Sequence, residues 1–221
     1  MSKNRRAVPT KCVLFDMDGT LCNTWLDLAR AVQAAMIDHS FPPPTDEDVL
    51  RFVGNGSFKL IELALPPDKK EYITECERYF QDYYRAHLTV HTAPYAGITE
   101  TLSELKKRGI SLGVVSNKSI GPLTEIVSAF FPMTFGAVFG GSPERPLKPA
   151  PDMLLAAAEA LGAAKDEVIY VGDSDVDVAA ARNAGFNGVF CSWGFQPREK
   201  LTAAGAENII DSPPELINYI D

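Results

Sequence analysis

The sequence predicts an α/β fold whose core is a Rossmann-like, doubly wound parallel sheet with a small all-helical cap domain inserted into it. The apolar run Cys12 to Phe15, typical of a buried strand, ends in an acidic loop. A block of helical patterns without any strand pattern follows over residues 23–92. From Pro94 onward helices and strands alternate, which is typical of βαβ units and of a parallel sheet covered on both faces. We therefore expect a core made of residues 1–22 and 93–221 and a cap made of residues 23–92.

The cap is expected to contain four helices. The first has apolar residues at helical spacing over residues 24–40, and Asn23 or Thr24 should cap it, because such side chains accept hydrogen bonds from first-turn amides. The others are expected over residues 45–53, 57–65 and 68–87, with Ser57 as the cap of the third helix. Glycines and prolines separate these segments, since both residue types interrupt helices.

The core is expected to continue from the first strand through five more strands, each preceded by a helix. The expected strands cover residues 110–115, 137–139, 168–171, 188–191 and 208–210. The expected helices cover residues 98–108, a segment ending near Phe130, residues 151–162, a segment ending near Ala184, residues 198–204 and a last helix from Pro213. A chain of 221 residues is long enough for one such domain with a modest insertion, or for two small domains.

Composition and charge argue against several classes of function. The net charge of −8 disfavours binding to nucleic acid or to an anionic membrane, for which a basic face is expected. No apolar run approaches the roughly 20 residues that span a bilayer. The basic start at residues 1–11 lacks the apolar stretch of a signal peptide, so we expect a polar tail there. The four cysteines are widely spaced and have no neighbouring histidines, which excludes a zinc site and predicts free thiols in the cytoplasm.

Polar residues follow three of the expected apolar strands. They are Asp16 and Asp18 after the first strand, Ser116 and Asn117 after the second, and Asp173 and Asp177 after the strand at residues 168–171. A fourth contribution is Lys148, in a loop bordered by prolines. Because the carboxyl ends of parallel strands share the edge where α/β sheets bind their ligands, we expect all of these side chains in one crevice.

Together these groups predict a cation and a phosphate in the crevice. Up to five carboxylates need positive charge nearby, and oxygen ligands without His or Cys suit Mg²⁺ rather than zinc. A pocket for a phosphate dianion would be formed by Ser116, Lys148 and the main-chain N–H groups of Gly19 and Asn117. One carboxylate of the Asp16–Asp18 pair is then free to act as a nucleophile and the other as a proton donor.

Each cluster, taken alone, also has a purely structural explanation. Asp and Gly are ordinary turn residues, so the first acidic loop is compatible with a simple turn. Ser116 and Asn117 are compatible with a helix cap, and Lys148 with a solvated lysine of a loop. The segment from Asp173 to Asp177 is compatible with an acidic helix start, which the helix dipole favours.

All four motifs of one enzyme family occur here in order. They are Asp16-Met-Asp18-Gly-Thr20, then Ser116-Asn117, then Lys148-Pro-x-Pro, then Gly172-Asp173-x-x-x-Asp177. The chain therefore resembles the haloacid dehalogenase-like (HAD) superfamily hydrolases, in particular the phosphoglycolate phosphatase-like subgroup. The resemblance covers nearly the whole chain, including a helical cap after the first motif. Asn23 is one departure, since relatives often carry Asp there, and little effect on the chemistry is expected.

The resemblance implies a role for each matching residue. Asp16 would attack phosphorus and become an aspartyl phosphate, and Asp18 would protonate the leaving alcohol and then activate the hydrolytic water. Mg²⁺ would be held by Asp16, the main-chain carbonyl of Asp18 and Asp173, with Asp177 in support. Ser116 and Lys148 would hold the phosphoryl oxygens, and Lys148 would temper the repulsion between Asp16 and its dianionic target.

The second aspartate, Asp18, favours a phosphatase over a dehalogenase, because a halide leaves as a stable anion and an alkoxide needs a proton. A phosphonate-cleaving relative would need a Schiff-base lysine in the first cap helix, and residues 24–40 contain none. A sugar-phosphate phosphatase or phosphomutase stays an alternative, since a mutase begins with the same aspartyl phosphate. A non-catalytic phosphate-binding regulatory domain would be expected to lack Asp16 or Asp18.

The expected substrate is a small phosphorylated metabolite, and the resemblance points first to 2-phosphoglycolate. We expect the cap loop Gly54, Asn55 and Gly56 to select it, because two glycines let the backbone approach a ligand and expose its N–H groups. The loop would close over the crevice about hinges near residues 22–24 and 92–95. A plain turn between helices is the alternative. The oligomeric state, monomer or homodimer, stays open.

Overall fold

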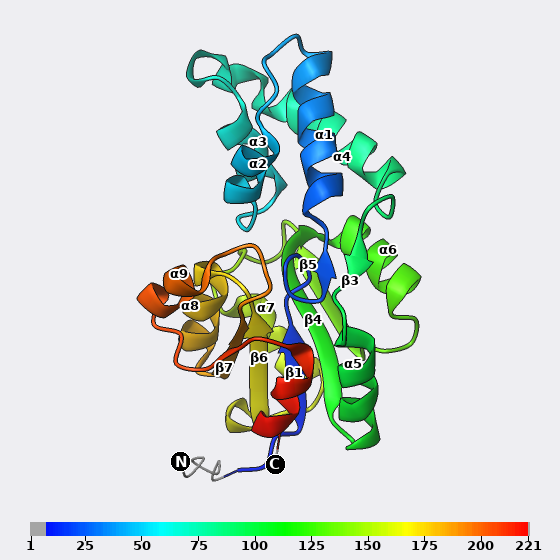
Figure 1. Ribbon diagram of the computed structural model, residues 1–221, viewed down its shortest axis with the longest axis vertical. Coiled ribbons are helices and arrows are strands. Elements are labelled where there is room, and N and C mark those ends of the chain that lie inside the picture. The colour runs from blue at the N-terminus through cyan, green and yellow to red at the C-terminus, as the bar shows by residue number, and fades with distance from the viewer. Residues whose placement is uncertain (1–7, 221) are drawn as a thin grey trace.

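A six-stranded parallel sheet forms the core of the computed structural model, which describes residues 8–220 (Figure 1). Residues 1–7 of the expected polar tail lie outside that range. The strands are β1 (Cys12–Phe15), β4 (Ser111–Ser119), β5 (Ala137–Gly141), β6 (Val168–Gly172), β7 (Asn187–Cys191) and β8 (Ile209–Ile210). Their order across the sheet is β5-β4-β1-β6-β7-β8, so the chain builds one half of the sheet on each side of β1.

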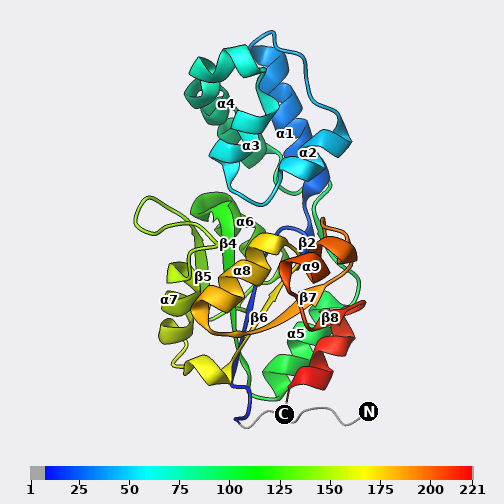
Figure 2. The ribbon, with the colours of Figure 1, turned by 90° about the vertical axis from the view of Figure 1, so that its left-hand side faces the viewer.

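Helices cover both faces of the sheet, which confirms the predicted α/β fold with a doubly wound parallel core (Figure 2). Val13 and Phe15 of β1 point to one face, and Cys12 and Leu14 to the other, as the alternation of a strand requires. The first face packs on α5 (Ile98–Lys107), α6 (Ile120–Phe130) and the C-terminal 3₁₀ helix η3 (Pro213–Tyr219). The second packs on α7 (Asp152–Ala160), α8 (Asp175–Ala184) and α9 (Arg198–Ala204).

Residues between the first two core strands form a helical layer over the carboxyl edge of the sheet (Figure 1). Its elements are α1 (Trp25–Asp38), α2 (Asp46–Phe52), α3 (Ser57–Ala64), the 3₁₀ helix η1 (Pro67–Tyr72) and α4 (Ile73–Ala86). The single helix expected over residues 68–87 is therefore wrong in its first turns. Pro67 starts a 3₁₀ segment, and Lys69 at φ −123° lies outside the helical region before the α-helical turns begin.

Two predicted helix caps are also wrong, because each side chain binds a more distant partner. Thr24 precedes α1, but its Oγ1 donates to Oδ1 of Asp18 at 2.5 Å and caps nothing. Ser57 is the first residue of α3, behind Gly56 as the N-cap, and its Oγ donates to Oε1 of Glu77 at 2.8 Å. Each hydroxyl thus joins separate elements instead of closing a single helix.

The chain enters and leaves the cap through a small antiparallel ribbon. Strand β2 (Cys22–Asn23) pairs with β3 (Ala93–Pro94), so the two connections lie side by side. Next to them, the buried carboxylate of Asp27 accepts hydrogen bonds from the main-chain N–H groups of His91 and Thr92 at 2.8–3.0 Å. The ribbon thus lies at the two segments where hinges were expected.

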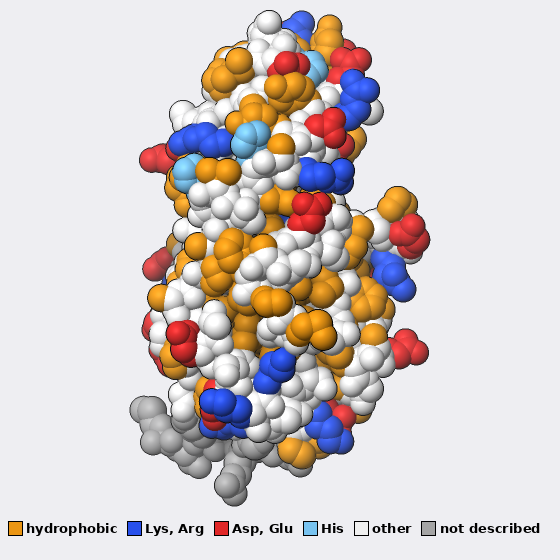
Figure 3. Space-filling view, turned by 90° about the vertical axis from the view of Figure 1, so that its right-hand side faces the viewer, with side chains coloured by type: hydrophobic (Ala, Val, Ile, Leu, Met, Phe, Trp, Pro, Cys, Tyr) orange, Lys and Arg blue, Asp and Glu red, His pale blue; other side chains and the backbone are white. Residues whose placement is uncertain are grey.

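The surface of the molecule carries mixed charge. On the face drawn in Figure 3, acidic and basic side chains are interspersed over the cap and the core. That face therefore lacks the continuous basic stripe that binding to nucleic acid requires. Within residues 8–220, none of the helices combines the length and the apolar character needed to cross a membrane.

Candidate active site

The carboxyl ends of β4, β1 and β6, three neighbouring strands, bring the expected polar residues together. Asp16 directly follows β1, and Asp173 directly follows β6. Ser116 and Asn117 lie inside β4 and not beyond it, because this strand continues to Ser119 after a shift in its pairing with β5. The predicted end of this strand at residue 115 was therefore too early. The crevice predicted from the sequence lies at this edge.

Three buried carboxylates form the centre of the site. One oxygen from each of Asp16, Asp173 and Asp177 lies within 4.8 Å of the others. Burial and the nearby carboxylates of Asp177 and Asp18 raise the pKa of Asp16 to about 6, against the opposing effect of Lys148. Burial followed by the charges of Asp177 and Asp16 also raises the pKa of Asp173 well above its ordinary value. Such a cluster favours a bound cation, which would relieve the repulsion.

The donor set fits a hard divalent cation. Oδ1 of Asp16 is buried and accepts no hydrogen bond from the described residues. Each oxygen of Asp173 accepts one, Oδ1 from the Thr20 hydroxyl at 2.9 Å and Oδ2 from the Phe195 N–H at 2.7 Å, so each keeps a free lone pair. Including Asp18, the four carboxylates outnumber the two buried lysines of the site by two charges, which Mg²⁺ would neutralise.

Asp177 serves a different purpose from Asp16 and Asp173. Its Oδ1 accepts hydrogen bonds from Lys148 and Tyr170, and its Oδ2 accepts from Ser174 and the N–H of Asp173. Although burial opposes ionisation, Lys148 lowers the pKa of Asp177 below its ordinary value. Asp177 therefore holds Lys148 and the loop after β6 in place.

Lys148 is a buried lysine and not a solvated one. Its side chain is 2% exposed, and its Nζ lies 3.0 Å from Oδ1 of Asp16, 2.8 Å from Oδ1 of Asp177 and 2.9 Å from the hydroxyl of Tyr170. Burial by itself would lower the pKa of Lys148, but the two carboxylates raise it above its ordinary value. The lysine is therefore positively charged beside the first aspartate.

Asn117 connects three parts of the site through its side chain. Its Nδ2 donates to the carbonyl oxygens of Lys148 at 2.9 Å and of Gly54 at 3.0 Å. Its Oδ1 accepts from the N–H of Lys148 at 2.7 Å. The side chain thus fixes the lysine loop and touches the cap loop. A helix cap, the structural alternative, does not describe this residue.

Gly19 has a different role from the expected one. Its N–H donates to the carbonyl oxygen of Cys22 at 3.0 Å, so the prediction that it binds phosphate is wrong. A Cβ at Gly19 would lie 2.2 Å from Oδ2 of Asp173, and the residue has φ +84°, which favours glycine. Gly194 approaches Asp173 from the other side, where a Cβ would lie 2.2 Å from the Cβ of Asp173. Both glycines therefore make room for this carboxylate.

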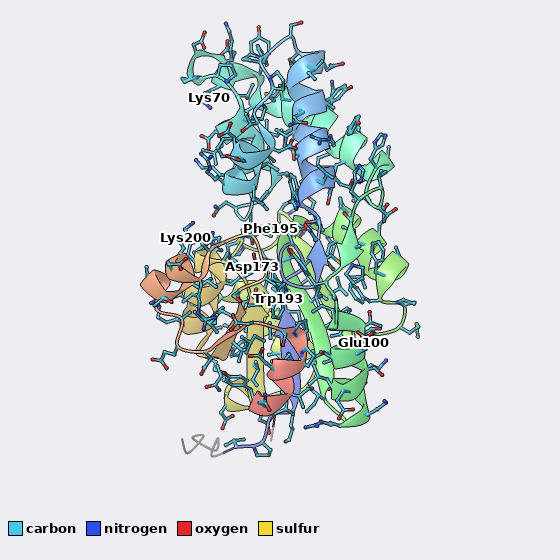
Figure 4. The ribbon with its side chains drawn as sticks, in the orientation of Figure 1. Lys70, Glu100, Asp173, Trp193, Phe195 and Lys200 are labelled. Carbon is cyan, nitrogen blue, oxygen red and sulfur yellow. The ribbon has the colours of Figure 1, made fainter. Side chains whose placement is uncertain are left out.

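Several residues that shape the site received no predicted role from the sequence, although Thr20 belongs to the first motif. Thr20 and the main chain of Phe195 hold Asp173, and Figure 4 shows Asp173, Trp193 and Phe195 close together below the cap. Lys118 contacts Asp18, with 3.0 Å between its Nζ and Oδ1. Lys118 directly follows Ser116 and Asn117, so its place in this polar run was the available signal. A bond from a main-chain N–H leaves no such signal.

A cavity of about 210 Å³ lies between the cap and the core. Asp16, Asp18 and Ser116 line it from the core, and Gly54 and Gly56 line it from the cap. Asn55 is exposed and is not among the described residues that line the cavity. The lining also includes apolar side chains (Leu28, Leu50, Val53, Leu60, Phe80, Pro122, Phe195), the cations Arg51, Lys118 and Lys200, and several uncharged polar residues.

Comparisons with known proteins agree on one family. The model of the haloacid dehalogenase-like hydrolases matches residues 13–191. A phosphoglycolate phosphatase of Haemophilus influenzae (strain 86-028NP) is 32% identical over 219 residues, which cover 95% of this chain and 98% of that protein. An N-acetylmuramic acid 6-phosphate phosphatase of Pseudomonas aeruginosa is 33% identical over 216 residues, which cover 96% of this chain and 95% of that protein. The crystal structure of a predicted phosphoglycolate phosphatase from Haemophilus somnus superposes with a TM-score of 0.85 at 28% identity. The superposition covers 96% of this chain and 98% of that one.

Proposed function

The chain belongs to the haloacid dehalogenase-like hydrolase family and is a phosphatase, and we propose that it hydrolyses a small phosphate monoester through an aspartyl phosphate on Asp16. The observation that carries this proposal is the placement of two aspartates. Asp16 belongs to the buried carboxylate cluster, whereas the side chain of Asp18 stays outside it, and both line the cavity under the cap. One carboxylate is thereby available to phosphorus and the other to the leaving group.

In the first half of the reaction, an oxygen of Asp16 forms a bond to phosphorus as the bond from phosphorus to the ester oxygen breaks. The leaving oxygen takes a proton from the carboxyl group of Asp18, so the alcohol departs uncharged. In the second half, the Asp18 carboxylate takes a proton from water, and this water attacks the phosphorus as the bond from phosphorus to the Asp16 oxygen breaks. Inorganic phosphate leaves, and both aspartates return to their starting states.

Ser116 and Lys148 are proposed to hold the transferring phosphoryl group. Both lie beside Asp16 at the carboxyl edge, and Lys148 carries its positive charge 3.0 Å from Oδ1 of Asp16. This charge offsets the repulsion between a carboxylate nucleophile and a phosphate dianion. Asn117 supports the arrangement by binding both main-chain groups of Lys148.

We propose Mg²⁺ as the cofactor, held by Asp16, Asp173 and the main-chain carbonyl of Asp18. This ligand set is supported by the free lone pairs on Asp173 and by the buried Oδ1 of Asp16, which accepts no hydrogen bond from the described residues although it is paired with Nζ of Lys148 at 3.0 Å. The ion would supply charge neutralisation for the phosphoryl oxygens. Asp177 is not proposed as a ligand, because its own oxygens are already occupied by hydrogen bonds. It supports Asp173 by accepting a hydrogen bond from the Asp173 N–H.

The first candidate substrate is 2-phosphoglycolate, on which the H. influenzae relative is named to act. N-acetylmuramic acid 6-phosphate is a second candidate, because the P. aeruginosa relative is equally similar. Both esters carry a carboxylate, and two cations, Arg51 of the cap and Lys200 of α9, line the cavity. We propose that the loop at Gly54 and Gly56 limits the size of the leaving group, since it forms part of the lining.

Initial rates over a panel of phosphate esters with Mg²⁺ test the proposal. The panel should contain both candidate esters, hexose phosphates and nucleotides, and one ester should exceed the others in kcat/KM by at least about tenfold. Loss of all turnover in Asp16→Asn identifies the site as the source of activity. A glucose-phosphate substrate that yields an isomer and no inorganic phosphate would show a mutase in place of a hydrolase.

Two further assignments accompany this function. We propose that the cap and core meet at residues 22/23 and 92/93, which the pairing of β2 with β3 supports. We also propose a cytoplasmic location. All four cysteines are buried and free, as expected in a reducing compartment.

A further inference from the structure

Lys118 is a buried lysine that has no role in the reaction proposed above. Its side chain is 4% exposed, and its Nζ lies 3.0 Å from Oδ1 of Asp18. The same Nζ donates a hydrogen bond to the hydroxyl of Tyr84 at 2.8 Å and lies 4.5 Å from the centre of the Tyr84 ring. A buried ammonium group is costly unless it is paired, so these contacts account for its presence there.

The two buried lysines of the site contact different aspartates. Lys148 contacts Asp16 and Asp177, the nucleophile and its support. Among the carboxylates of residues 8–220, Lys118 forms an ion pair with Asp18 alone. Lys148 is proposed to bind the phosphoryl group. Lys118 is therefore available to position the proton donor, Asp18.

The contacts around Asp18 leave one of its oxygens open. Oδ1 receives both Lys118 at 3.0 Å and the Thr24 hydroxyl at 2.5 Å. Oδ2 has no hydrogen-bond partner among residues 8–220, and Asp18 lines the cavity. A carboxyl group held by one oxygen presents the other in a defined direction, as proton transfer to a leaving group requires.

The hold on Asp18 extends into the cap. Three consecutive residues at the end of β4 bond to the cap: Asn117 to the Gly54 carbonyl, Lys118 to Tyr84, and Ser119 to the amide of Gln81. Of these three, only Lys118 also contacts Asp18. Tyr84 itself is 2% exposed on α4, where its ring stacks on Phe80 with centres 5.5 Å apart. The cap therefore reaches the proton donor by two routes, directly through the hydroxyl of Thr24 and, from α4, through Tyr84 and Lys118.

We propose that Lys118 is a positioning residue that aims Asp18 at the leaving oxygen, and that Tyr84 makes this depend on the cap being in place. The inference rests on the proposed phosphatase reaction. During that reaction the proton moves from Asp18 to the leaving oxygen, and Lys118 keeps its own protons. Tyr84 acts through Lys118 and touches no reacting atom.

The test compares two esters that differ in their need for a proton. An alkyl phosphate has a basic leaving group that requires protonation, whereas the 4-nitrophenolate of 4-nitrophenyl phosphate leaves readily without it. The measured quantity is kcat/KM, which reports the step up to loss of the alcohol. Lys118→Met should lower kcat/KM for the best alkyl phosphate by about 100-fold, and that for 4-nitrophenyl phosphate by less than about fivefold. Tyr84→Phe keeps the ring and removes the hydroxyl, and it should show the same selective loss, smaller in size.

Ser119→Ala provides a matched control. This substitution removes the hydrogen bond from the Gln81 amide and so weakens the contact between cap and core, but it leaves Lys118 unchanged. It should change kcat/KM for both esters by the same factor. An equal loss on both esters in Lys118→Met and Tyr84→Phe would overturn the inference, since it would indicate a structural role only. Unchanged rates in both variants would overturn it as well. Wild-type activity that survives in Asp16→Asn would instead refute the proposed reaction, so the two failures are distinguishable.

Discussion

The side-chain amide of Asn117 donates to the main-chain carbonyl oxygen of Gly54 at 3.0 Å, and this bond joins the end of β4 to the loop between α2 and α3. Gly56, two residues on, lies so close to the core that a Cβ there would be 2.9 Å from Cδ1 of Leu147. The loop thus lies against the core beside the phosphate pocket. Both glycines line the cavity, so the loop is placed where it could contact a substrate.

Gly56→Val should therefore alter substrate choice. The residue has φ +83°, and the added side chain would push the loop away from Leu147, so the wall of the cavity would move. We expect KM for the best substrate to rise about tenfold and the ranking within the ester panel to change. Turnover of 4-nitrophenyl phosphate serves as the control and should change much less. An unchanged ranking would show that the loop only connects α2 and α3.

Removal of metal should abolish activity. EDTA is expected to stop turnover and Mg²⁺ to restore it, because a divalent cation would neutralise the two negative charges by which the carboxylates of the site exceed its buried lysines. Added Mg²⁺ should also raise the melting temperature, since binding to the folded state stabilises it. Asp173→Asn should lose most of this rise and should need far more Mg²⁺ for activity. Full turnover in a preparation shown to be metal-free would contradict the proposed cofactor.

The stability of the metal-free protein should fall as the pH rises. The folded protein keeps a proton on Asp16 up to about pH 6, whereas the ordinary pKa of Asp is 3.8, so the folded state binds more protons between these values. The unfolding free energy should therefore decrease from about pH 4 to pH 6, by about 3 kcal/mol. Burial of Asp173, whose pKa is also raised, acts in the same direction.

Urea unfolding in EDTA at several pH values measures this effect. Asp16→Asn carries no titrating group at that position, so its unfolding free energy should vary less with pH than that of the wild type. Mg²⁺ should remove most of the decrease, because the cation takes the place of the proton. A wild-type stability that is constant from pH 4 to pH 7 without metal would contradict the picture of a strained carboxylate cluster.

Much of the fold could be predicted because its strands end in conspicuous polar residues. The apolar residues of β1 and β6 are buried on both faces, so their sequences contain hardly any polar position until Asp16 and Asp173. The family resemblance predicted from four short motifs is confirmed by the match over residues 13–191. These patterns lie within short stretches of sequence, so they can be recognised without knowing how the chain packs.

The remaining features depend on contacts between distant segments. Thr24 looks like a helix cap, but folding brings the Asp18 carboxylate to its hydroxyl, which donates a strong hydrogen bond to this charged acceptor at 2.5 Å and accepts none from the first-turn amides. The hold of Phe195 on Asp173 comes from a main-chain N–H, which every residue except proline has. The contact between Lys118 and Tyr84 needs the cap to be docked on the core. Phe195 is 22 residues from Asp173 and Lys118 is 34 residues from Tyr84, so no local pattern in the sequence predicts either contact.

The proposed reaction depends most directly on which carboxylate becomes phosphorylated. Rapid acid quench of the wild type during turnover, followed by borohydride reduction of the acyl phosphate and peptide mass spectrometry, identifies the modified residue. Asp18→Asn, which keeps the nucleophile but lacks the base for hydrolysis, should accumulate more of the adduct, and beryllium fluoride should occupy the same position as a mimic. We predict modification of Asp16 alone. Modification of Asp18, or continued turnover with neither aspartate modified, would contradict the proposed reaction.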